Sequence, residues 1–412
     1  MEVRPGYKWT EVGVIPEDWE VMSLSTVSDV RDGTHESPKF YATGVPFITS
    51  KNISDGRIDL SNIAFISEDD AREFNKRSRV SKGDILMSMI GTIGNVALVD
   101  LEPDFCIKNV ALVKPFGASA GFLIQLLRST AFQGYLDGQL AGGIQKFISL
   151  GRLRDLPIPL PPFPEQRAIA TVLSDIDALI TALDKLIAKK RAIKQATMQQ
   201  LLTGRTRLPG FSGEWRMLCL QEIADIDTEN LSSSTDPDYA FRYISLEDVD
   251  EGVLRRYSEL KFGLAPSRAR RVVRQNDILI STVRPNLKSH LFIRDNVSDL
   301  ICSTGFSVLR CNPVIAEPVF VFFHLFSDNI DRRIQALLVG SNYPAINSRD
   351  VGDLQIPLPP LPEQRAIAAV LSDMDAEIDA LERRRDKTRA LKQGMMQELL
   401  TGRIRLTSVA PS

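Results

Sequence analysis

Long apolar runs are missing from this sequence of 412 residues. The longest, Val319 to Phe326, is interrupted by His324 and is too short to cross a bilayer. The start of the chain, Met1 to Thr10, lacks the apolar core that a signal peptide needs. We therefore expect a cytoplasmic protein.

Metal and redox ligands are also scarce. The four cysteines are widely separated, without the close pairing of a zinc or redox site: Cys106, Cys219, Cys302 and Cys311. The three histidines, His35, His290 and His324, have no spacing typical of a metal site or of a catalytic Ser-His-Asp group. We expect reduced thiols, structural or surface histidines, and no metal.

Charge of one sign is not in excess either, because the formal net charge is -2. This excludes a uniformly basic nucleic-acid binder but leaves local basic surfaces possible. The apolar fraction of 43% and the charged fraction of 25% are typical of a globular protein. The length predicts two to four domains.

Internal repetition dominates what is present. Residues 158–208 align without a gap on residues 356–406 at an offset of 198, and 35 of the 51 positions are identical. Both copies contain IPLPP-x-PEQRAIA-x-VLSD-x-DA and end in LLTGR-x-RL. The chain therefore consists of two related halves.

Outside these segments the halves are much less alike. Apolar residues and turns recur at offsets of 193 to 196. The equivalent positions are Trp19 and Trp215, Ile48 and Ile244, Gly56 and Gly252, and residues 84–88 and 277–281. Two domains with one fold and different surfaces are what a single chain needs in order to recognise two different targets.

The repeated segment predicts a long helix in each half. The prolines between residues 159 and 162 keep the chain extended, whereas Pro164 suits a first helical position and Glu165 suits the positive end of the helix dipole. Gly204 and Gly402 stand where a left-handed cap would end each helix. From Glu165 to Leu202 a helix would be about 57 Å long.

An apolar stripe runs along each predicted helix in steps of three and four residues. Its members are Ile169, Leu173, Ile176, Ile180, Leu183 and Ile187 in the first copy, and Ile367, Leu371, Met374, Ile378 and Leu381 in the second. A lone helix would leave this stripe in water. We expect the two helices to pack as an antiparallel coiled coil with pseudo-twofold symmetry.

The remaining segments predict two similar mixed α/β domains, so the expected fold class is α+β. The expected boundaries are residues 1–157 for the first domain, 158–207 for the first helical spacer, 208–355 for the second domain, 356–406 for the second spacer and 407–412 for a tail. Short runs rich in β-branched residues predict strands at 45–49, 85–90, 96–99, 278–283 and 306–310. Helices are expected at 120–135 and 318–335.

The repeated motifs resemble the conserved regions of the specificity (S) subunit of type I restriction-modification systems. The resemblance covers the whole chain in order: recognition domain, conserved helix, recognition domain, conserved helix. The tail Leu399 to Leu406 also matches the join Leu201 to Leu208, and Pro16 to Trp19 is similar to the stretch ending at Trp215. Such circular order is a feature of that family.

This resemblance implies a division of labour. Each target-recognition domain would bind one half of a bipartite double-stranded DNA target, and the helices would set the spacer and bind two methyltransferase (M) subunits. Those modification subunits would use S-adenosylmethionine to methylate an adenine in each half. Two restriction (R) subunits with ATP and magnesium would cleave unmodified DNA. The resemblance implies no catalytic residue and no cofactor in this chain.

Polar and basic residues near glycine-rich turns are the expected DNA contacts, because such contacts are usually made from loops and because Arg and Asn can each bind a base edge in two places. In the first domain they are Lys51, Asn52, Thr92, Asn95, Gln145 and Lys146. In the second they are Arg268, Arg270, Arg271, Arg284, Asn286, Lys288, Asn342 and Tyr343. Solvated turn residues are the alternative interpretation.

The basic runs Lys189 to Arg191 and Arg383 to Arg385 could follow spacer phosphates, bind an acidic partner or be ordinary solvated helix faces.

Three other functions remain open from the residues alone. One is a stand-alone DNA-binding scaffold. Another is a metal-dependent nuclease, suggested by Pro237-Asp238 with Glu259-Leu-Lys261, although the first half lacks this pattern. Self-contained methyl transfer is suggested only by Asp236-Pro-Asp-Tyr, which departs from the Asp-Pro-Pro-Tyr signature at Asp238 and has no glycine-rich cofactor loop beside it.

Overall fold

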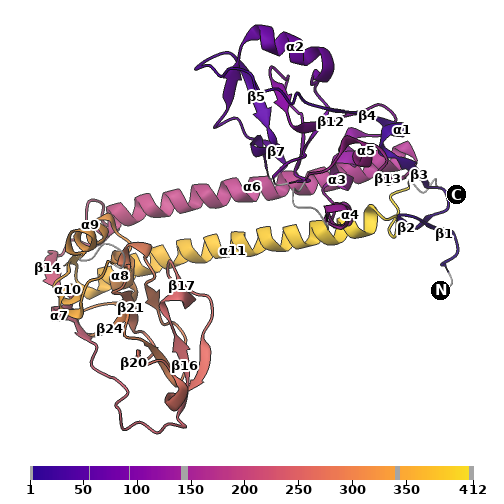
Figure 1. The fold of residues 1–412 in the computed structure, drawn as a ribbon. Helices are drawn as coiled ribbons and strands as arrows, with labels where there is room; N and C mark the ends of the chain where they lie inside the picture. The colour runs from indigo at the N-terminus through magenta and orange to yellow at the C-terminus, as the bar shows by residue number, and fades with distance from the viewer. Residues whose placement is uncertain (1–2, 55, 92, 141–146, 339–343, 408–412) are drawn as a thin grey trace. The chain divides into compact units, whose positions relative to one another are not determined.

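The computed structural model describes residues 3–54, 56–91, 93–140, 147–338 and 344–407 (Figure 1). The chain forms two compact units, of which unit 1 comprises residues 1–184 and 383–412 and unit 2 comprises residues 185–382. Each unit contains one mixed α/β domain and a part of each long helix. Among the described residues, no helix has the length and apolar character needed to span a membrane.

Unit 1 contains a four-stranded antiparallel sheet of order β10-β9-β12-β4 and a three-stranded sheet of order β11-β5-β8, in which β11 and β5 are parallel. Its strands are β1 (Tyr7–Thr10), β2 (Gly13–Pro16), β3 (Glu20–Ser23), β4 (Ser28–Asp32), β5 (Val45–Thr49), β6 (Ile53–Ser54), β7 (Arg57–Ile58), β8 (Ala64–Ile66), β9 (Ile85–Ser88), β10 (Val96–Leu98), β11 (Cys106–Lys108), β12 (Val110–Pro115) and β13 (Pro157–Leu160). Its shorter helices are α1 (Leu24–Val27), η1 (Ser50–Asn52), α2 (Glu68–Ser78), α3 (Ala120–Leu127), α4 (Thr130–Leu140) and α5 (Leu150–Arg154).

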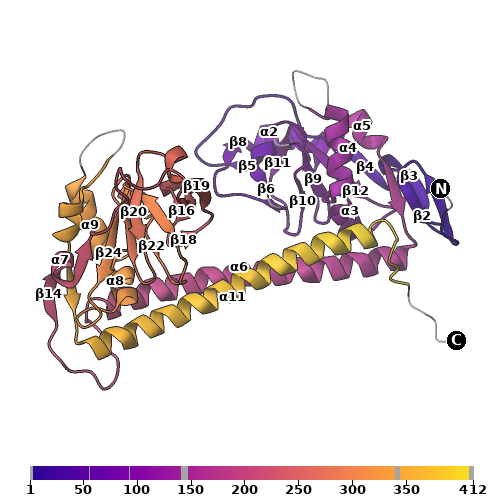
Figure 2. The same ribbon diagram turned by 90° about the horizontal axis from the view of Figure 1, so that it is seen from below.

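Unit 2 has a similar architecture, although its second sheet has four strands where that of unit 1 has three (Figure 2). Its sheets have the orders β15-β24-β21-β22 and β19-β16-β23-β20, and β16 and β23 are again parallel. Its strands are β14 (Arg216–Cys219), β15 (Ala224–Ile226), β16 (Ala240–Ile244), β17 (Val249–Asp250), β18 (Val253–Leu254), β19 (Ser258–Lys261), β20 (Ala269–Val273), β21 (Ile278–Ser281), β22 (Leu291–Phe292), β23 (Leu300–Ser303), β24 (Phe306–Cys311) and β25 (Gln355–Leu358). Its shorter helices are α7 (Leu220–Ile223), η2 (Leu246–Asp248), η3 (Phe262–Leu264), η4 (Pro285–Leu287), α8 (Pro318–His324), α9 (Asp328–Leu337) and α10 (Ser348–Gly352).

The central strands are apolar on both faces because both faces are covered. In β9, Ile85 and Met87 belong to one hydrophobic cluster and Leu86 to another. In β21, Ile278 and Leu279 likewise belong to two different hydrophobic clusters. Alternate residues of a strand point to opposite faces, so a buried strand needs no polar alternation. The expected strands are confirmed, with ends that differ by up to two residues.

The two helices expected at 120–135 and 318–335 are each interrupted, which corrects the prediction. In unit 1, α3 ends at Leu127 and α4 begins at Thr130, where the Ser129 hydroxyl accepts a hydrogen bond of 3.2 Å from the Phe132 amide. In unit 2, the Ser327 hydroxyl accepts from the Ile330 amide at 3.4 Å and caps α9. A serine cap starts a new helix, and apolar periodicity alone does not reveal it.

The long helices are α6 (Phe163–Leu201) and α11 (Leu361–Leu399), each of 39 residues. Gly204 and Gly402, which follow them, both have φ of 69°, the left-handed conformation expected of a cap. The Gln166 side chain accepts from the Ser119 amide at the start of α3 (2.9 Å), and the Gln364 side chain accepts from the Glu317 amide at the start of α8 (2.8 Å). The repeated Pro-Glu-Gln motif therefore ties each long helix to its domain.

The parts of α6 and α11 within each unit run antiparallel, and equivalent ion pairs join them. In unit 1, Lys392 lies 2.8 Å from Asp177 and Arg389 lies 3.0 Å from Asp184. In unit 2, the equivalent pairs at the offset of 198 are Lys194 with Asp375 and Arg191 with Glu382. Residue numbers rise along one helix as they fall along the other. The expected antiparallel pairing is confirmed.

A buried carboxylate joins three distant segments in unit 1 and two in unit 2, where the arginine and the tryptophan lie on one connection; we call this the Trp–Glu–Arg cluster. In unit 1, Glu165 is 2% exposed, accepts from the Trp19 indole N–H at 3.1 Å and accepts two hydrogen bonds of 2.8 Å from Arg405. In unit 2, Glu363 is fully buried and is bound in the same way by Trp215 and Arg207. In each unit, the Pro-Glu-Gln motif at the start of one long helix thus meets the Arg-x-Arg-Leu motif that follows the other long helix.

Removing the arginine of one cluster should loosen that unit alone. We expect Arg405→Gln to destabilise unit 1 and Arg207→Gln to destabilise unit 2, each by about 3 kcal/mol, because a buried carboxylate loses its counter-charge. Hydrogen exchange followed by mass spectrometry would locate the loss of protection. The control is Arg403→Gln, since the Arg403 side chain is 67% exposed. Equal loss of protection in both units from either variant would contradict this account.

Candidate nucleic-acid interface

In unit 1, the carboxyl ends of the parallel strands β5 and β11 form one edge of the domain. The exposed Lys51 lies in η1, directly after β5. The neighbouring Ser50 hydroxyl donates a hydrogen bond of 3.0 Å to the Asn109 carbonyl, which follows β11. Lys51 and the β11–β12 turn therefore belong to one surface.

Asn52 has a structural role that the sequence did not reveal. It is 7% exposed, and its side-chain oxygen accepts from the Thr49 amide at 3.0 Å while its amide group donates to the Asp59 carbonyl at 3.1 Å. The equivalent residue of unit 2, Asp248, closes the same turn on Ser245. The structure does not support Asn52 as a DNA contact, because its polar atoms are used within the fold.

Strand β9 continues into a turn that contacts the chain after residue 146 in unit 1. Ile90 pairs with Phe147, and the Ile148 amide donates to the Met89 carbonyl at 3.4 Å. Met89 and Ile90, at the start of the Gly91 turn, are therefore adjacent to Phe147 and Ile148. Asn95 is half-buried and donates to the Ile53 carbonyl at 3.1 Å. Thr92, Gln145 and Lys146 lie outside the described residues.

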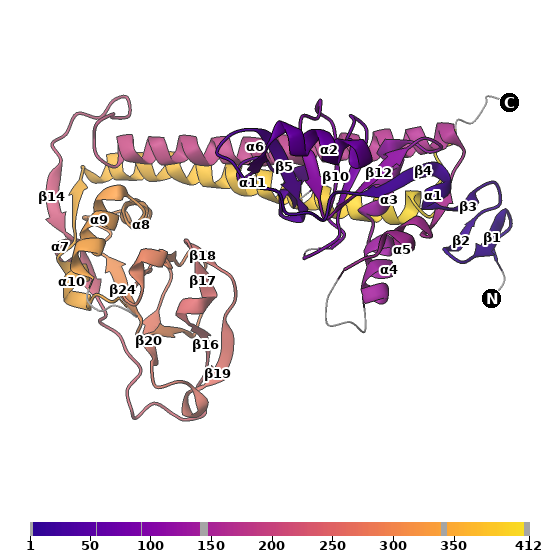
Figure 3. The same ribbon diagram turned by 45° about the horizontal axis from the view of Figure 1, so that its top comes forward.

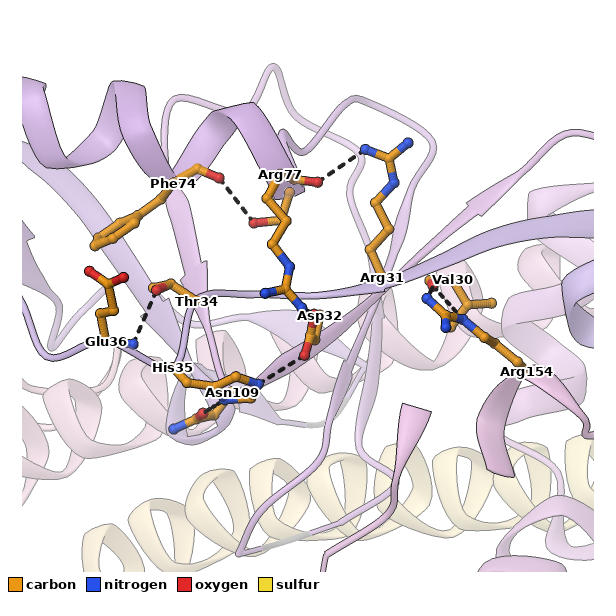
Figure 4. Close-up of polar contacts among 11 residues, drawn as sticks. Val30, Arg31, Asp32, Thr34, His35, Glu36, Phe74, Arg77, Asn109 and Arg154 are labelled. Atoms are coloured by element: carbon orange, nitrogen blue, oxygen red, sulfur yellow. Dashed lines mark hydrogen bonds and ion pairs between the residues drawn. The ribbon is translucent and has the colours of Figure 1, made fainter. Parts of the chain in front are cut away.

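A cluster around His35 lies at the same edge, and the sequence did not mark it as part of a site (Figure 4). His35 bridges Asn109 (2.7 Å) and the nearly buried Asp32 (2.9 Å), and Arg77 also binds Asp32. The hydrogen bonds to Asn109 and Asp32 hold the pKa of His35 above its usual value. These hydrogen bonds therefore favour the protonated form of His35, which lies at the edge that carries Lys51. Only the fold brings Asp32 and Asn109 together, so no sequence signal marks this cluster.

Unit 2 has a hollow of about 760 Å³ at the equivalent edge. The exposed Arg268 and Arg284 line it together with Ser245 and Ser303, and so do the acidic residues Glu247 and Asp250. The structure therefore brings together two of the predicted arginines, which come from different loops.

The Pro344 carbonyl accepts a hydrogen bond of 2.7 Å from the Arg284 amide, so Pro344 lies beside this arginine. Asn342 and Tyr343 themselves lie outside the described residues. Asn286 is exposed, whereas the half-buried Lys288 lies 3.3 Å from Asp331.

Arg270 and Arg271 are less accessible than expected. The Arg271 side chain is 15% exposed, lies 3.0 Å from Asp227 and donates to the Phe306 carbonyl at 3.1 Å. Arg270 is half-buried, and its guanidinium group lies 4.6 Å from the centre of the Phe262 ring. The structure does not support Arg271 as a DNA contact, because releasing it would leave the nearly buried Asp227 without its counter-charge.

The predicted stripe residues lie in two environments. Ile169, Leu173, Ile367 and Leu371 are buried in the domain clusters, which also contain the ends of the opposite long helix, Met396 and Leu399 in unit 1 and Met198 and Leu201 in unit 2. Leu183, Ile187 and Ile378 are buried, and Ile176, Ile180, Met374 and Leu381 are half-buried. The first turns of each long helix thus complete a domain core as well as facing the partner helix.

The basic runs on the helices are partly used within the helix pair. Lys190 lies 2.7 Å from Glu377, Arg191 pairs with Glu382, and Arg385 lies 3.7 Å from Asp184. Lys189, Arg383 and Arg384 are exposed.

The residues behind the nuclease interpretation do not form a metal site. Lys261 is paired with Asp238 at 2.9 Å, and both side chains are more than half exposed. Across the described part of the chain, no group of three or more His, Cys, Asp or Glu side chains could hold a metal ion. A lysine bound to the lone aspartate competes with a cation for it.

Burial lowers the pKa of two histidines in unit 2, His290 to about 4 and His324 to about 3. In His324, the Nε2 atom is buried without a hydrogen-bond partner. Both side chains are neutral when folded. Between about pH 6.5, the usual pKa of histidine, and about pH 4, unfolding therefore takes up protons, so the stability of unit 2 falls as the pH falls.

Replacing His324 by leucine, the residue at the equivalent position 126, should remove part of this sensitivity. We expect His324→Leu to stabilise the protein by about 2 kcal/mol more at about pH 5 than at about pH 7.5. Urea unfolding at both pH values would measure this difference. The same gain at both values would show that His324 takes up no proton on unfolding.

Comparison with known proteins gives consistent results. The family model described as type I restriction modification DNA specificity domain matches residues 16–195 and 212–388. The MjaX type I restriction enzyme specificity subunit of Methanocaldococcus jannaschii is 30% identical, with 97% of each chain covered. The MjaVIII specificity subunit of the same organism is 23% identical, covering 96% of this chain and 95% of that protein. The solved S subunit of a type I restriction-modification system from M. genitalium has a similar fold, with a TM-score of 0.60 at 16% identity, covering 97% of this chain and 98% of that chain.

Proposed function

The chain belongs to the family of type I restriction-modification specificity subunits, and from this premise we propose how it recognises DNA. It is the DNA-recognition subunit of such an enzyme and has no catalytic role of its own. In our proposal each recognition domain binds one half of a bipartite target, and the helices hold the halves of the complex in register.

One observation carries the proposal: equivalent positions on a shared frame carry different chemistry. Asn52 and Asp248 close the same turn in the two units, so the residues before them are equivalent. That position holds Lys51 in unit 1 and Glu247 in unit 2. A cation and a carboxylate at one position favour different groups on DNA, since lysine binds phosphate whereas a carboxylate accepts from cytosine. The two half-sites would therefore differ in sequence.

Two recognition domains are needed for physical reasons. Each mismatched base pair costs only about 1–3 kcal/mol, so a few base pairs do not single out a target in a genome. Linking two domains multiplies their selectivity when the link fixes their spacing. The interhelix ion pairs and the Trp–Glu–Arg clusters are the contacts that would fix this spacing.

The repeated frame also suggests the partners. Two equivalent units offer two equivalent surfaces, which fits two M subunits, each binding S-adenosylmethionine. Two R subunits using ATP and magnesium would complete the enzyme. With DNA as the target, this assembly would work in the cytoplasm. A stand-alone scaffold would need neither kind of subunit.

Exchanging one domain should change one half of the target. We expect a chimera with residues 1–157 taken from a different specificity subunit, co-expressed with the M subunit, to methylate a site with one new half and one unchanged half. Genome-wide mapping of methylated adenines would measure this.

The unexchanged chain, mapped with the same M subunit, is the control. Changes in both halves of the site, or an isolated chain that is fully active and does not co-purify with the M subunit, would contradict the proposal and favour the scaffold.

Lengthening the helices should lengthen the spacer. We expect four residues inserted after Ala188 and four after the equivalent Asp386 to add about 6 Å to each helix, which corresponds to one or two base pairs at about 3.4 Å each. Both helices must be changed, because the ion pairs on either side of the insertion point fix their register.

The matched control for this experiment is the insertion after Ala188 alone, which should shift the pairs out of register and destabilise the protein. A paired insertion that leaves the mapped spacer unchanged would contradict the role of the helices.

A further inference from the structure

A strained turn stands at the edge of unit 2 that carries the predicted arginines. In the 284–288 turn, Arg284 has φ of 49° and Lys288 has φ of 53°, so both ends of η4 are left-handed. Neither residue is glycine, and side chains are disfavoured in this conformation. Strain of this kind persists only where the surrounding structure enforces it, and it concentrates at binding sites.

Contacts on every side hold the 284–288 turn in place. Pro285, the first residue of η4, is buried. The Leu287 amide donates to the Arg284 carbonyl at 2.9 Å, and the Lys288 amide donates to the Pro285 carbonyl at 2.9 Å. The Lys288 ammonium group lies 3.3 Å from Asp331 on α9. These contacts therefore hold the turn rigidly, and they stabilise the left-handed backbone of Arg284 and Lys288.

This rigid turn presents an apolar side chain to solvent. Leu287, at the tip, is 57% exposed and lines the same hollow as Arg268 and Arg284. A scattered exposed leucine needs no explanation, but this one is held on a strained turn between cationic residues. Apolar side chains that insert between base pairs are presented to DNA in this way, with cations beside them to bind the phosphates.

We propose that Leu287 inserts at a base step of the second half-site and partly unstacks it, while Arg268 and Arg284 hold the adjoining backbone. This inference rests on the proposed function and adds a recognition element to it. A step that unstacks easily costs less to deform, so the insertion selects sequence without a hydrogen bond to a base. Part of the specificity of unit 2 thus comes from DNA deformability.

The equivalent turn of unit 1 is built differently. It contains Gly91 and Gly94, both with positive φ, and its apolar residue Ile93 is half-buried. Glycine adopts positive φ without strain. The inserted leucine is therefore expected in the second half-site, and the two halves would be recognised by different means.

The test uses the assembled methyltransferase, with the full chain and its M subunits, on duplexes carrying the mapped target. A 2-aminopurine probe, whose fluorescence rises when it leaves the base stack, replaces one base at a time across both half-sites. We expect a rise at one step of the second half-site, away from the methylated adenine, that is lost in Leu287→Ala and retained in Leu287→Met. Binding of the target by Leu287→Ala should be about tenfold weaker, as expected when one apolar contact is lost.

Met217→Ala is the matched control, because Met217 is a 55% exposed apolar residue of unit 2 on β14. It should leave both the probe signal and the affinity unchanged. Two results would overturn the inference: a probe signal in the second half-site that is the same in Leu287→Ala, or no signal there with the unaltered chain. In either case, methylation of the target would still support the proposed function. Failure of the assembled enzyme to bind any bipartite site would instead count against the proposed function. Loss of M-subunit binding in Leu287→Ala would show that the turn contacts protein rather than DNA.

Discussion

A buried carboxylate, present twice, is the constraint on which the rest of the structure depends. Transferring Glu165 or Glu363 out of water is costly unless the charge is paired and hydrogen-bonded. The tryptophan at the start of the domain and the arginine after the opposite long helix meet this requirement in both units. These groups come from three distant segments in unit 1 and from two in unit 2, so in each unit moving the arginine away would leave a buried carboxylate without its counter-charge. The clusters explain why the Pro-Glu-Gln and Arg-x-Arg-Leu motifs are identical in the two copies.

The same frame leaves one edge of each domain free to differ. The long helices, their glycine caps and the glutamines that bind the first turns of α3 and α8 are common to both units. In unit 2, β16 leads into the turn closed by Asp248, and the β17–β18 hairpin follows that turn (Figure 3). Beyond this point the equivalence ends: unit 1 has His35, Lys51 and Asn109, whereas unit 2 has a hollow with Arg268 and Arg284. A constant frame with a variable edge is how one chain can recognise two sequences.

Much of the fold could be predicted from the sequence, because it depends on repetition and periodicity. The two halves follow from the repeat at an offset of 198 residues, and the long helices and the central strands follow from patterns within a few residues of one another. The roles of individual residues were harder to predict from the sequence, because they depend on contacts across the fold. Asn52 resembled a DNA contact, but its side-chain amide donates to carbonyl groups that lie seven and ten residues away. The interhelix pairs of Asp177 and Asp184 depend on helix register, and His35 meets its distant partner Asn109 only because Thr34 pairs with Lys108 in the folded chain. The serines that divide α3 from α4 and α8 from α9 were the one local signal that apolar periodicity concealed.

The central claim is that two similar domains recognise two unlike stretches of DNA that are separated by a spacer without base contacts. Missing-base interference on the assembled enzyme tests it most directly, because it removes each base in turn and asks whether binding survives. We predict two separate clusters of sensitive bases with different sequences, flanking a spacer where base removal has no effect. A single continuous cluster, or two clusters of the same sequence, would contradict the account.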